Sequence, residues 1–295
     1  MIDPFVSTWL DELEAWAVQA TCGSTYLLVD AAFLPDTRRW LMNWPSTVGE
    51  TQALFHARPG ADEATLQASP WLLKYPVDTQ AARVQLGQCD GLPALTAIQT
   101  SESMACLLTR LRRWCTVRCD DMLFNFRYTD TRRLPGILSV LDAQQRLSLQ
   151  GEQSGWRWMG RDGRWCSIDG PQGEMPPTTA ARLDDDPCLN DMQFGALLRD
   201  SEADETLAAL ALESGADASE IFTLLPSQRH AYAEACLNQA DRWRLEGSTQ
   251  RVALCRYVLS GAAQRRLEGL KQMPQPEANT DIEALLKALE DMSCA

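Results

Sequence analysis

The pattern of apolar residues changes once along this 295-residue chain, at a stretch rich in proline and aspartate. Before residue 169, short strand-like runs alternate with amphipathic helical segments, which is typical of a mixed α/β domain. Residues 169–190 contain four prolines and the run Asp184-Asp185-Asp186, which predict a linker. The remaining pattern is helical throughout. The sequence therefore predicts a mixed α/β N-terminal lobe, residues 1–168, followed by an all-α C-terminal lobe, residues 191–295.

The N-terminal lobe is predicted to combine short strands, two hairpins and several helices. Apolar runs bounded by turn residues indicate the strands, and leucines three and four residues apart indicate the helices. Asp142 and Gln145 form a capping-box pattern at the start of one short helix. The expected strands are Tyr26–Val29, Gln52–His56, Trp71–Tyr75 and Pro93–Gln99, the expected hairpins are Thr116–Tyr128 and Trp156–Ile168, and the main helices are Asp36–Met42, Asp78–Leu86 and Glu102–Trp114.

The C-terminal lobe is predicted to be a set of short helices separated by glycine and proline. Residues 273–280 contain two prolines and predict a short linker before a terminal helix, Ile282–Met292. The apolar stripe of this helix fits two arrangements: packing on the lobe, which is the more usual one, or a detachable helix that binds a partner. The other expected helices are Met192–Leu198, Glu205–Leu212, Ser219–Leu225, Gln228–Leu237, Gln239–Leu245, Gln250–Leu259 and Ala263–Leu270.

The segment Met122–Asp130 combines an apolar strand pattern with an arginine. Alternate residues from Met122 to Tyr128 are apolar, so one face of a strand here is predicted to be buried. Arg127 lies inside this pattern and needs a partner, because a buried, unpaired guanidinium is very costly. Asp130 is the nearest carboxylate. We therefore predict a buried Arg127–Asp130 ion pair, with Asp130 also placed to cap the next helix.

The order aromatic-Arg-aromatic-x-Asp at residues 126–130, after an arginine-rich amphipathic helix, resembles a known family. It is similar to the chaperone and adaptor proteins of bacterial type VI secretion, which dock toxic effectors onto the VgrG spike. Further segments fit in the same order over roughly residues 24–167. They are Tyr26–Ala32, Ser69–Leu73, Leu141-Asp142 with Gln144-Gln145, and the pair Trp156 and Trp158.

The chain departs from the family pattern at two places. Thr131 stands where the family usually has proline, and residues 112–114 stand where it often has histidine. These departures leave the fold unaffected and the surface chemistry of this member open. The residues that carry the motif are Tyr26, Asp30, Pro70, Phe126, Arg127, Tyr128 and Asp130.

The resemblance implies a non-enzymatic protein that binds a cognate effector toxin in the cytoplasm and helps to load it onto the VgrG spike. It implies no catalytic residue, no cofactor and no metal. Composition agrees: the only histidines are His56 and His230, and no phosphate-binding glycine loop is present. Two alternatives stay open: an α/β enzyme that uses Asp30 or Asp130, and an immunity-type inhibitor, suggested by the acidity and small size of the chain.

The net charge of −13 is unevenly distributed. Residues 181–295 carry 11 basic and 20 acidic side chains, which argues against nucleic-acid binding there, since phosphates need cations. This acidity suits a basic protein partner or simply keeps the lobe soluble. The chain has no run of 18 apolar residues and no signal-peptide pattern after Met1, so we expect a cytoplasmic protein without a membrane partner.

Two groups of residues are candidates for partner binding. Arg110, Arg112 and Arg113 lie on one predicted helix and form either a basic patch or a solvated face with internal ion pairs. Trp243 lies between Arg242 and Arg244, and tryptophan and arginine are the residues that binding hot spots favour. We therefore predict that Trp243 is an exposed anchor.

Overall fold

The computed structural model describes residues 1–19, 23–45, 50–58, 60–170, 187–214, 223–276 and 282–294. They divide into two compact units, Met1–Leu197 and Leu198–Ala295. The first combines an antiparallel sheet with helices and the second is helical, so the predicted fold class is confirmed. The division falls inside one helix, later in the chain than the predicted lobe boundary.

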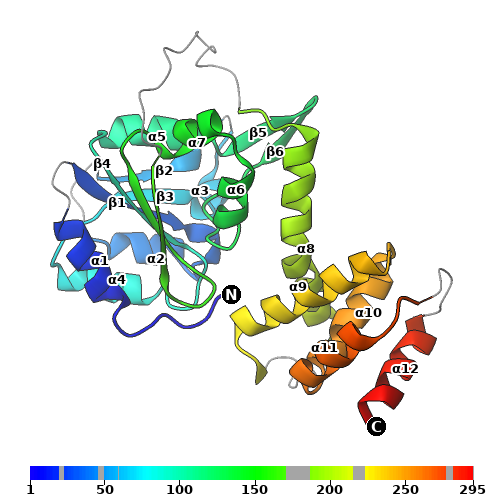
Figure 1. The fold of residues 1–295 in the computed structure, drawn as a ribbon. Helices are drawn as coiled ribbons and strands as arrows, with labels where there is room; N and C mark the ends of the chain where they lie inside the picture. The colour runs from blue at the N-terminus through cyan, green and yellow to red at the C-terminus, as the bar shows by residue number, and fades with distance from the viewer. Residues whose placement is uncertain are drawn as a thin grey trace. The chain divides into compact units, whose positions relative to one another are not determined.

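A six-stranded antiparallel sheet forms the centre of the first unit (Figure 1). Its strand order is β2-β3-β1-β4-β7-β8. A separate two-stranded sheet is formed by β5 and β6. The strands are β1 (Ser24–Asp30), β2 (Thr51–Ala53), β3 (Pro70–Lys74), β4 (Leu95–Thr100), β5 (Thr116–Cys119), β6 (Met122–Asn125), β7 (Gly155–Met159) and β8 (Trp165–Asp169).

The central strand β1 is buried on both faces, which explains its uninterrupted apolar run. Tyr26 and Leu28 belong to one hydrophobic core, whereas Leu27 and Val29 belong to the other. The period-two alternation of a strand sends neighbouring side chains to opposite faces. Helices therefore have to cover both sides of the sheet.

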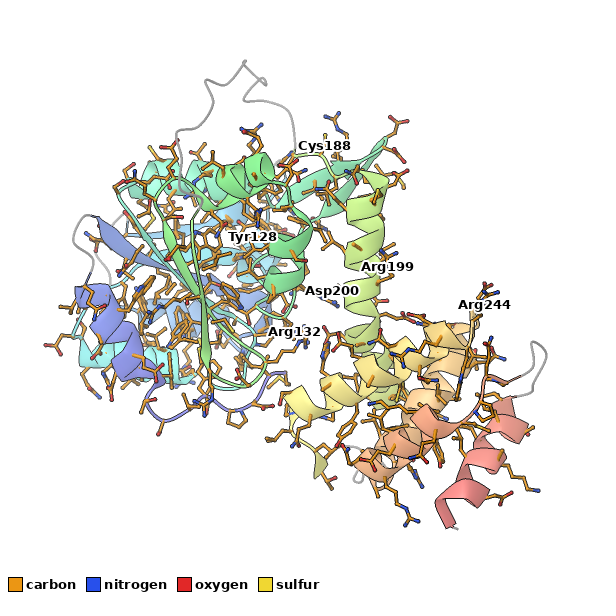
Figure 2. All side chains as sticks on the ribbon, in the orientation of Figure 1. Tyr128, Arg132, Cys188, Arg199, Asp200 and Arg244 are labelled. Carbon is orange, nitrogen blue, oxygen red and sulfur yellow. The ribbon has the colours of Figure 1, made fainter. Side chains whose placement is uncertain are left out.

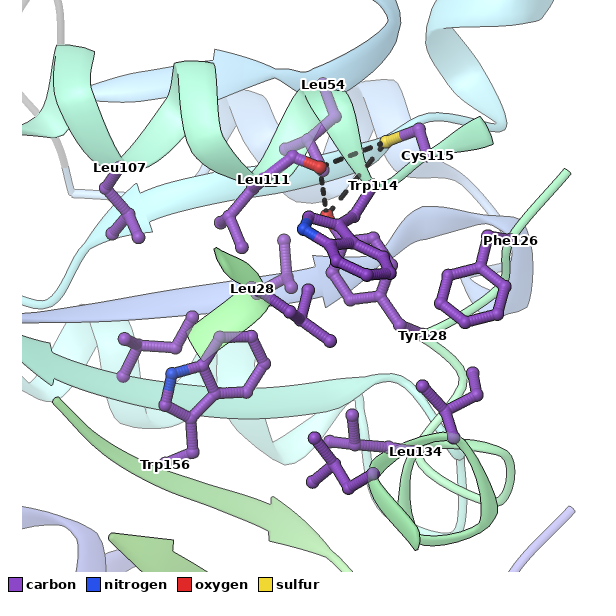
Figure 3. Close-up of a cluster of buried hydrophobic side chains, with 14 of the residues drawn as sticks. Leu28, Leu54, Leu107, Leu111, Trp114, Cys115, Phe126, Tyr128, Leu134 and Trp156 are labelled. Carbon is purple, nitrogen blue, oxygen red and sulfur yellow. Dashed lines mark hydrogen bonds between the residues drawn. The ribbon is translucent and has the colours of Figure 1, made fainter. Parts of the chain in front are cut away.

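The first face is covered by α5 (Met104–Arg113), α6 (Leu134–Val140) and α7 (Ala143–Gln150). Leu107 and Leu111 of α5 pack into a core that also contains the fully buried Trp156 of β7 (Figure 3). The predicted capping box of α7 is confirmed: Asp142 Oδ1 accepts from the backbone N–H of Gln145 at 2.8 Å, and Gln145 Oε1 accepts from that of Asp142 at 2.9 Å.

The second face is covered by α1 (Trp9–Val18), α2 (Thr37–Met42) and α4 (Gln80–Gly87). Trp40 stacks on Trp44 with 5.2 Å between the ring centroids, and both are buried. Asp36 caps α2, because its carboxylate accepts from the backbone N–H of Arg39 at 2.9 Å. The short helix α3 (Glu63–Gln67) and the 3₁₀ turns Ala31–Phe33 and Leu54–Ala57 lie in the connections.

The second unit is built from longer helices than the sequence predicts. Residues 199–204 contain no glycine or proline, so the two expected segments on either side of them form one helix, α8. Arg251 of α10 links three helices, because it binds Glu202 of α8 at 2.5 Å and Asp241 of α9 at 2.7 Å. The helices are α8 (Asp191–Ser214), α9 (Pro226–Arg242), α10 (Ser248–Leu259), α11 (Ala263–Gln272) and α12 (Ile282–Cys294).

Two predicted strands are too long. The strand expected at Gln52–His56 ends at Ala53 and continues as a 3₁₀ turn, and the strand expected to reach Tyr128 ends at Asn125. Most of the predicted linker and part of the helix expected at Ser219–Leu225 lie outside the described residues. No helix in the described part of the chain is long and apolar enough to cross a membrane.

The terminal helix α12 packs on the helical unit, so the more usual of the two arrangements is confirmed. Leu285 and Leu289 are almost completely buried in the core that they share with α10 and α11. We expect Leu285→Ala to lower the free energy of unfolding of this unit by about 2–5 kcal/mol, because it removes buried methyl groups and leaves a cavity.

Chemical denaturation followed by circular dichroism measures this loss. Lys287→Ala, an exposed substitution on the same helix, is the control and is expected to change the free energy by less than about 0.5 kcal/mol. Equal values for the two variants would mean that α12 is detached in solution.

Candidate functional site

A cleft of about 170 Å³ opens at the end of β1, beside the start of β3 and the segment that follows β6. Segments far apart in the sequence meet here because Asp30 and Pro70 are register partners in the antiparallel pair β1–β3. Residues 125–129 close the third side. The lining consists of Asp30, Ala32, Phe55, Arg58, Ala68, Pro70, Cys115, Asn125, Phe126, Arg127, Tyr128 and Thr129.

Asp30 lies buried at the inner end of this cleft and accepts hydrogen bonds from three groups. The backbone N–H of Ala32 donates to Oδ1 at 3.2 Å, and the Thr129 hydroxyl donates to Oδ2 at 2.8 Å. The third donor is Arg127, whose guanidinium lies 3.4 Å from Oδ2. Asp30 therefore ties the end of β1 to the segment after β6.

The predicted Arg127–Asp130 pair is wrong. Arg127 pairs with Asp30 and its side chain is 52% exposed. Asp130 instead forms a two-point ion pair with Arg132, with N–O distances of 3.0 and 2.8 Å. The reason is that the strand ends at Asn125, so the following residues turn and no longer alternate across a sheet. Asp130 also binds the backbone N–H of Arg132 and does not cap α6.

The two ion pairs lie next to the same aromatic ring. The Arg127 guanidinium is 5.2 Å from the centroid of Phe33, and that of Arg132 is 5.4 Å from it. Both distances are within the range of a cation–π contact. Phe33, which the sequence motifs did not single out, therefore helps to orient the arginines of the segment.

The floor of the cleft is formed by Cys115, Phe126 and Tyr128, which carry no charge. The Tyr128 hydroxyl donates to the carbonyl of Leu111 at 2.7 Å, and the Cys115 thiol points at the same oxygen (Figure 3). Burial raises the pKa of Tyr128 well above its ordinary value and raises that of the Cys115 thiol to about 11. Phe126 packs against Trp114, with 5.8 Å between the centroids. Because burial raises both pKa values, the Tyr128 hydroxyl and the Cys115 thiol stay protonated near neutral pH.

Arg58 forms part of the rim of the cleft. Its guanidinium lies 3.8 Å above the Phe55 ring and makes contacts of 3.3 Å with Asn125 Oδ1 and with the carbonyl of Cys115. No sequence motif contains Arg58, because it follows a 3₁₀ turn in a region where the sequence predicts a strand. The local signal for this contact is Phe55, an aromatic residue three positions before Arg58.

The predicted basic patch on α5 is largely taken up by structural contacts. Arg110 pairs with Glu102 and also binds the carbonyl of Leu149. Arg112 donates to the carbonyls of Ala53 and Leu54 at 2.9 and 3.0 Å, which satisfies the end of the short edge strand β2. Arg113 is half-buried. Of the two interpretations, internal pairing accounts for Arg110 and Arg112.

The prediction of an exposed anchor at Trp243 is also wrong. Trp243 is only 5% exposed and belongs to the core of the helical unit, because it lies at the C-terminal end of α9 where the chain turns inward. Arg244 has a left-handed backbone, with φ of 58°, and its side chain projects outward (Figure 2). The backbone reversal between the two residues puts them on opposite sides.

A second cluster of possible ligand atoms lies at the β5–β6 hairpin. The thiol of Cys119 and the carboxylates of Asp120 and Asp191 all lie within 4.8 Å of one another. These are three ligands, one fewer than a structural zinc site uses. Burial and the two carboxylates raise the pKa of the Cys119 thiol, which opposes the thiolate form that a metal binds.

Part of the first unit matches the model of a protein family. Residues 25–148 match the model of a family described as a domain of unknown function, DUF4123. The matched span runs from β1 to α7 and contains every residue that lines the cleft. Searches of curated proteins and of solved structures gave no match. The chain is thus similar to this family over less than half of its length.

Of the seven residues that carry the sequence motif, five line the cleft: Asp30, Pro70, Phe126, Arg127 and Tyr128. The other two support it from outside. Tyr26 donates through its hydroxyl to the carbonyl of Glu102 at 3.2 Å, and Asp130 orders the turn through Arg132. The motif thus describes one local structure, drawn from β1, from β3 and from the segment that follows β6.

The two ion pairs predict unequal effects on stability. Arg127→Ala is expected to lower the free energy of unfolding by less than about 1 kcal/mol, because the pair is half exposed to water. Asp130→Asn is expected to lower it by about 3 kcal/mol, because it removes the buried carboxylate charge that pairs with the half-buried Arg132. Urea denaturation of the two variants measures both values. A loss of about 3–5 kcal/mol for both variants would instead support a buried Arg127–Asp130 pair.

The raised pKa of Cys115 predicts its reactivity. In native protein at pH 8, iodoacetamide is expected to modify the exposed Cys106 rapidly and to leave Cys115 unmodified, because little of the buried thiol is ionised three pH units below its pKa. Peptide mass spectrometry quantifies both sites. In urea both thiols should react, and rapid native labelling of Cys115 would contradict the closed floor of the cleft.

Proposed function

We propose that this chain is a non-enzymatic chaperone and adaptor that binds a type VI secretion effector, a toxin, in the cytoplasm and promotes its loading onto the VgrG spike. The main support is the agreement between two spans. The motifs that resemble effector adaptors cover roughly residues 24–167, and the DUF4123 match covers residues 25–148. Both contain every residue that lines the cleft.

The chemistry of the cleft supports a binding role. Its thiol and its phenol are both held neutral by burial, and its one carboxylate is engaged by three donors. A thiol or a phenol whose pKa is raised is a poor nucleophile near neutral pH. The arrangement therefore favours a protein that holds another molecule over one that transforms it.

In this proposal, the two units have different tasks. The sheet unit, which carries the family match, is the scaffold, and the acidic helical lobe supplies much of the specificity for the client. The lobe lies outside the matched residues, and its negative charge suits a client with a basic surface.

Affinity purification of tagged protein from cells that express the secretion genes tests the proposal. We expect mass spectrometry to identify a large toxin-like protein, a VgrG spike protein, or both. Recovery of neither would overturn the adaptor role and favour the alternative of an α/β enzyme. A recovered toxin whose activity is neutralised stoichiometrically would instead identify an immunity-type inhibitor.

An exchange of lobes tests the division of tasks. Replacing residues 190–295 with those of a relative that serves another effector is expected to switch the client that is recovered. The unmodified relative, purified from the same cells, is the control. An unchanged client would place specificity in the sheet unit.

A further inference from the structure

Two arginines on the rim of the cleft keep hydrogen-bonding capacity that the fold does not use. A guanidinium has five N–H donors, and within the described part of the chain Arg58 makes two hydrogen bonds, both of 3.3 Å and both through one nitrogen. Arg58 pairs with no carboxylate among the described residues. Among the described residues, the Arg127 guanidinium makes one hydrogen bond, of 3.4 Å, with Asp30. Arg112, by contrast, binds two carbonyls at about 3 Å with two of its nitrogens.

The rings beneath these arginines restrict their movement. Phe55 lies under Arg58 at 3.8 Å, and Phe33 lies near Arg127 at 5.2 Å. A guanidinium in contact with an aromatic ring keeps its edge N–H groups available, and less side-chain entropy is lost when a ligand binds. The two arginines are therefore oriented before any partner arrives.

The charge of the lining is positive although the chain as a whole is strongly acidic. The lining contains two arginines and one aspartate, a net of +1, and Asp30 is already shared between Thr129 and Arg127. The remaining positive charge belongs mainly to Arg58. Anions are thus favoured at the rim, and a carboxylate matches the two-point geometry of a guanidinium.

The size and the walls of the cleft restrict what else the ligand contains. A volume of about 170 Å³ is below the range of pockets for cofactors and drug-sized molecules, which starts near 300 Å³. It suits one or two side chains. Phe55, Pro70 and Phe126 make the walls apolar, so a carboxylate alone would leave them uncovered.

From these observations we propose that the cleft binds a short peptide segment of the client in which a carboxylate stands next to an apolar side chain. The carboxylate binds Arg58 and Arg127, and the apolar side chain covers Phe55, Pro70 and Phe126. An acidic side chain and a free C-terminus share this chemistry. The inference rests on the proposed adaptor function and names the part of the partner that this site takes.

Peptide binding by the full-length protein tests the inference. The probe is a fluorescein-labelled set of hexapeptides with one glutamate flanked by leucine, valine or phenylalanine, prepared with free and with amidated C-termini. Matched peptides carry glutamine in place of glutamate. Fluorescence anisotropy is expected to show binding that needs a carboxylate, and the amidated and glutamine peptides tell a C-terminus from an acidic side chain.

Variants locate the site. Arg58→Ala is expected to weaken peptide binding about tenfold or more, because it removes charge-assisted hydrogen bonds. Arg58→Lys keeps the charge without the planar fork and should recover only part of the affinity. Arg38→Ala is the control and should bind as wild type, because it removes an exposed arginine of α2 that pairs with Glu63 of α3. Circular dichroism confirms that each variant is folded.

Several results would overturn the inference: no binding of any peptide, binding of the amidated glutamine peptide as tight as that of the peptides that carry a carboxylate, or wild-type affinity in Arg58→Ala. Its failure can be told from failure of the adaptor function. If Arg58→Ala still recovers the client that wild type recovers from cells, the adaptor function stands and the client binds elsewhere. If wild type recovers no client, the adaptor function itself fails.

Discussion

The structure of the first unit depends on a strand that is buried on both faces. Every residue from Tyr26 to Asp30 is buried, and β1 pairs with β3 on one side and β4 on the other. Such a strand has to end in a residue that satisfies the backbone as the chain turns. Asp30 does this, because its carboxylate accepts from the N–H of Ala32 and binds the segment after β6. The cleft exists at this point because the sheet ends here.

The arginines of this unit show how position decides between structure and binding. Arg110 and Arg112 lie on α5. Their N–H groups bind Glu102 and backbone carbonyls of the same unit. Arg58 and Arg127 lie on irregular segments at the rim, where they make few and long contacts. Segments between regular elements expose their side chains more often, which is why binding residues concentrate there.

Much of the architecture could be predicted from the sequence. The continuous apolar run of β1, the capping box of Asp142 and Gln145, and the stripe of α12 each follow from local periodicity and hydrogen bonding. The ion pairs could not be predicted in this way. Asp130 is the nearest carboxylate to Arg127 along the chain, but the pair that forms joins Arg127 to Asp30, 97 residues away.

The sequence by itself determined the fold class, the change from a mixed sheet unit to a helical unit, and the group of residues that make up the motif. These properties are encoded by patterns a few residues long. Only the tertiary structure decided which of those residues meet, that Trp243 is buried, and that Arg58 belongs to the cleft. The register of β1 against β3 sets these contacts, and register arises from the packing of the whole sheet and not from any one segment.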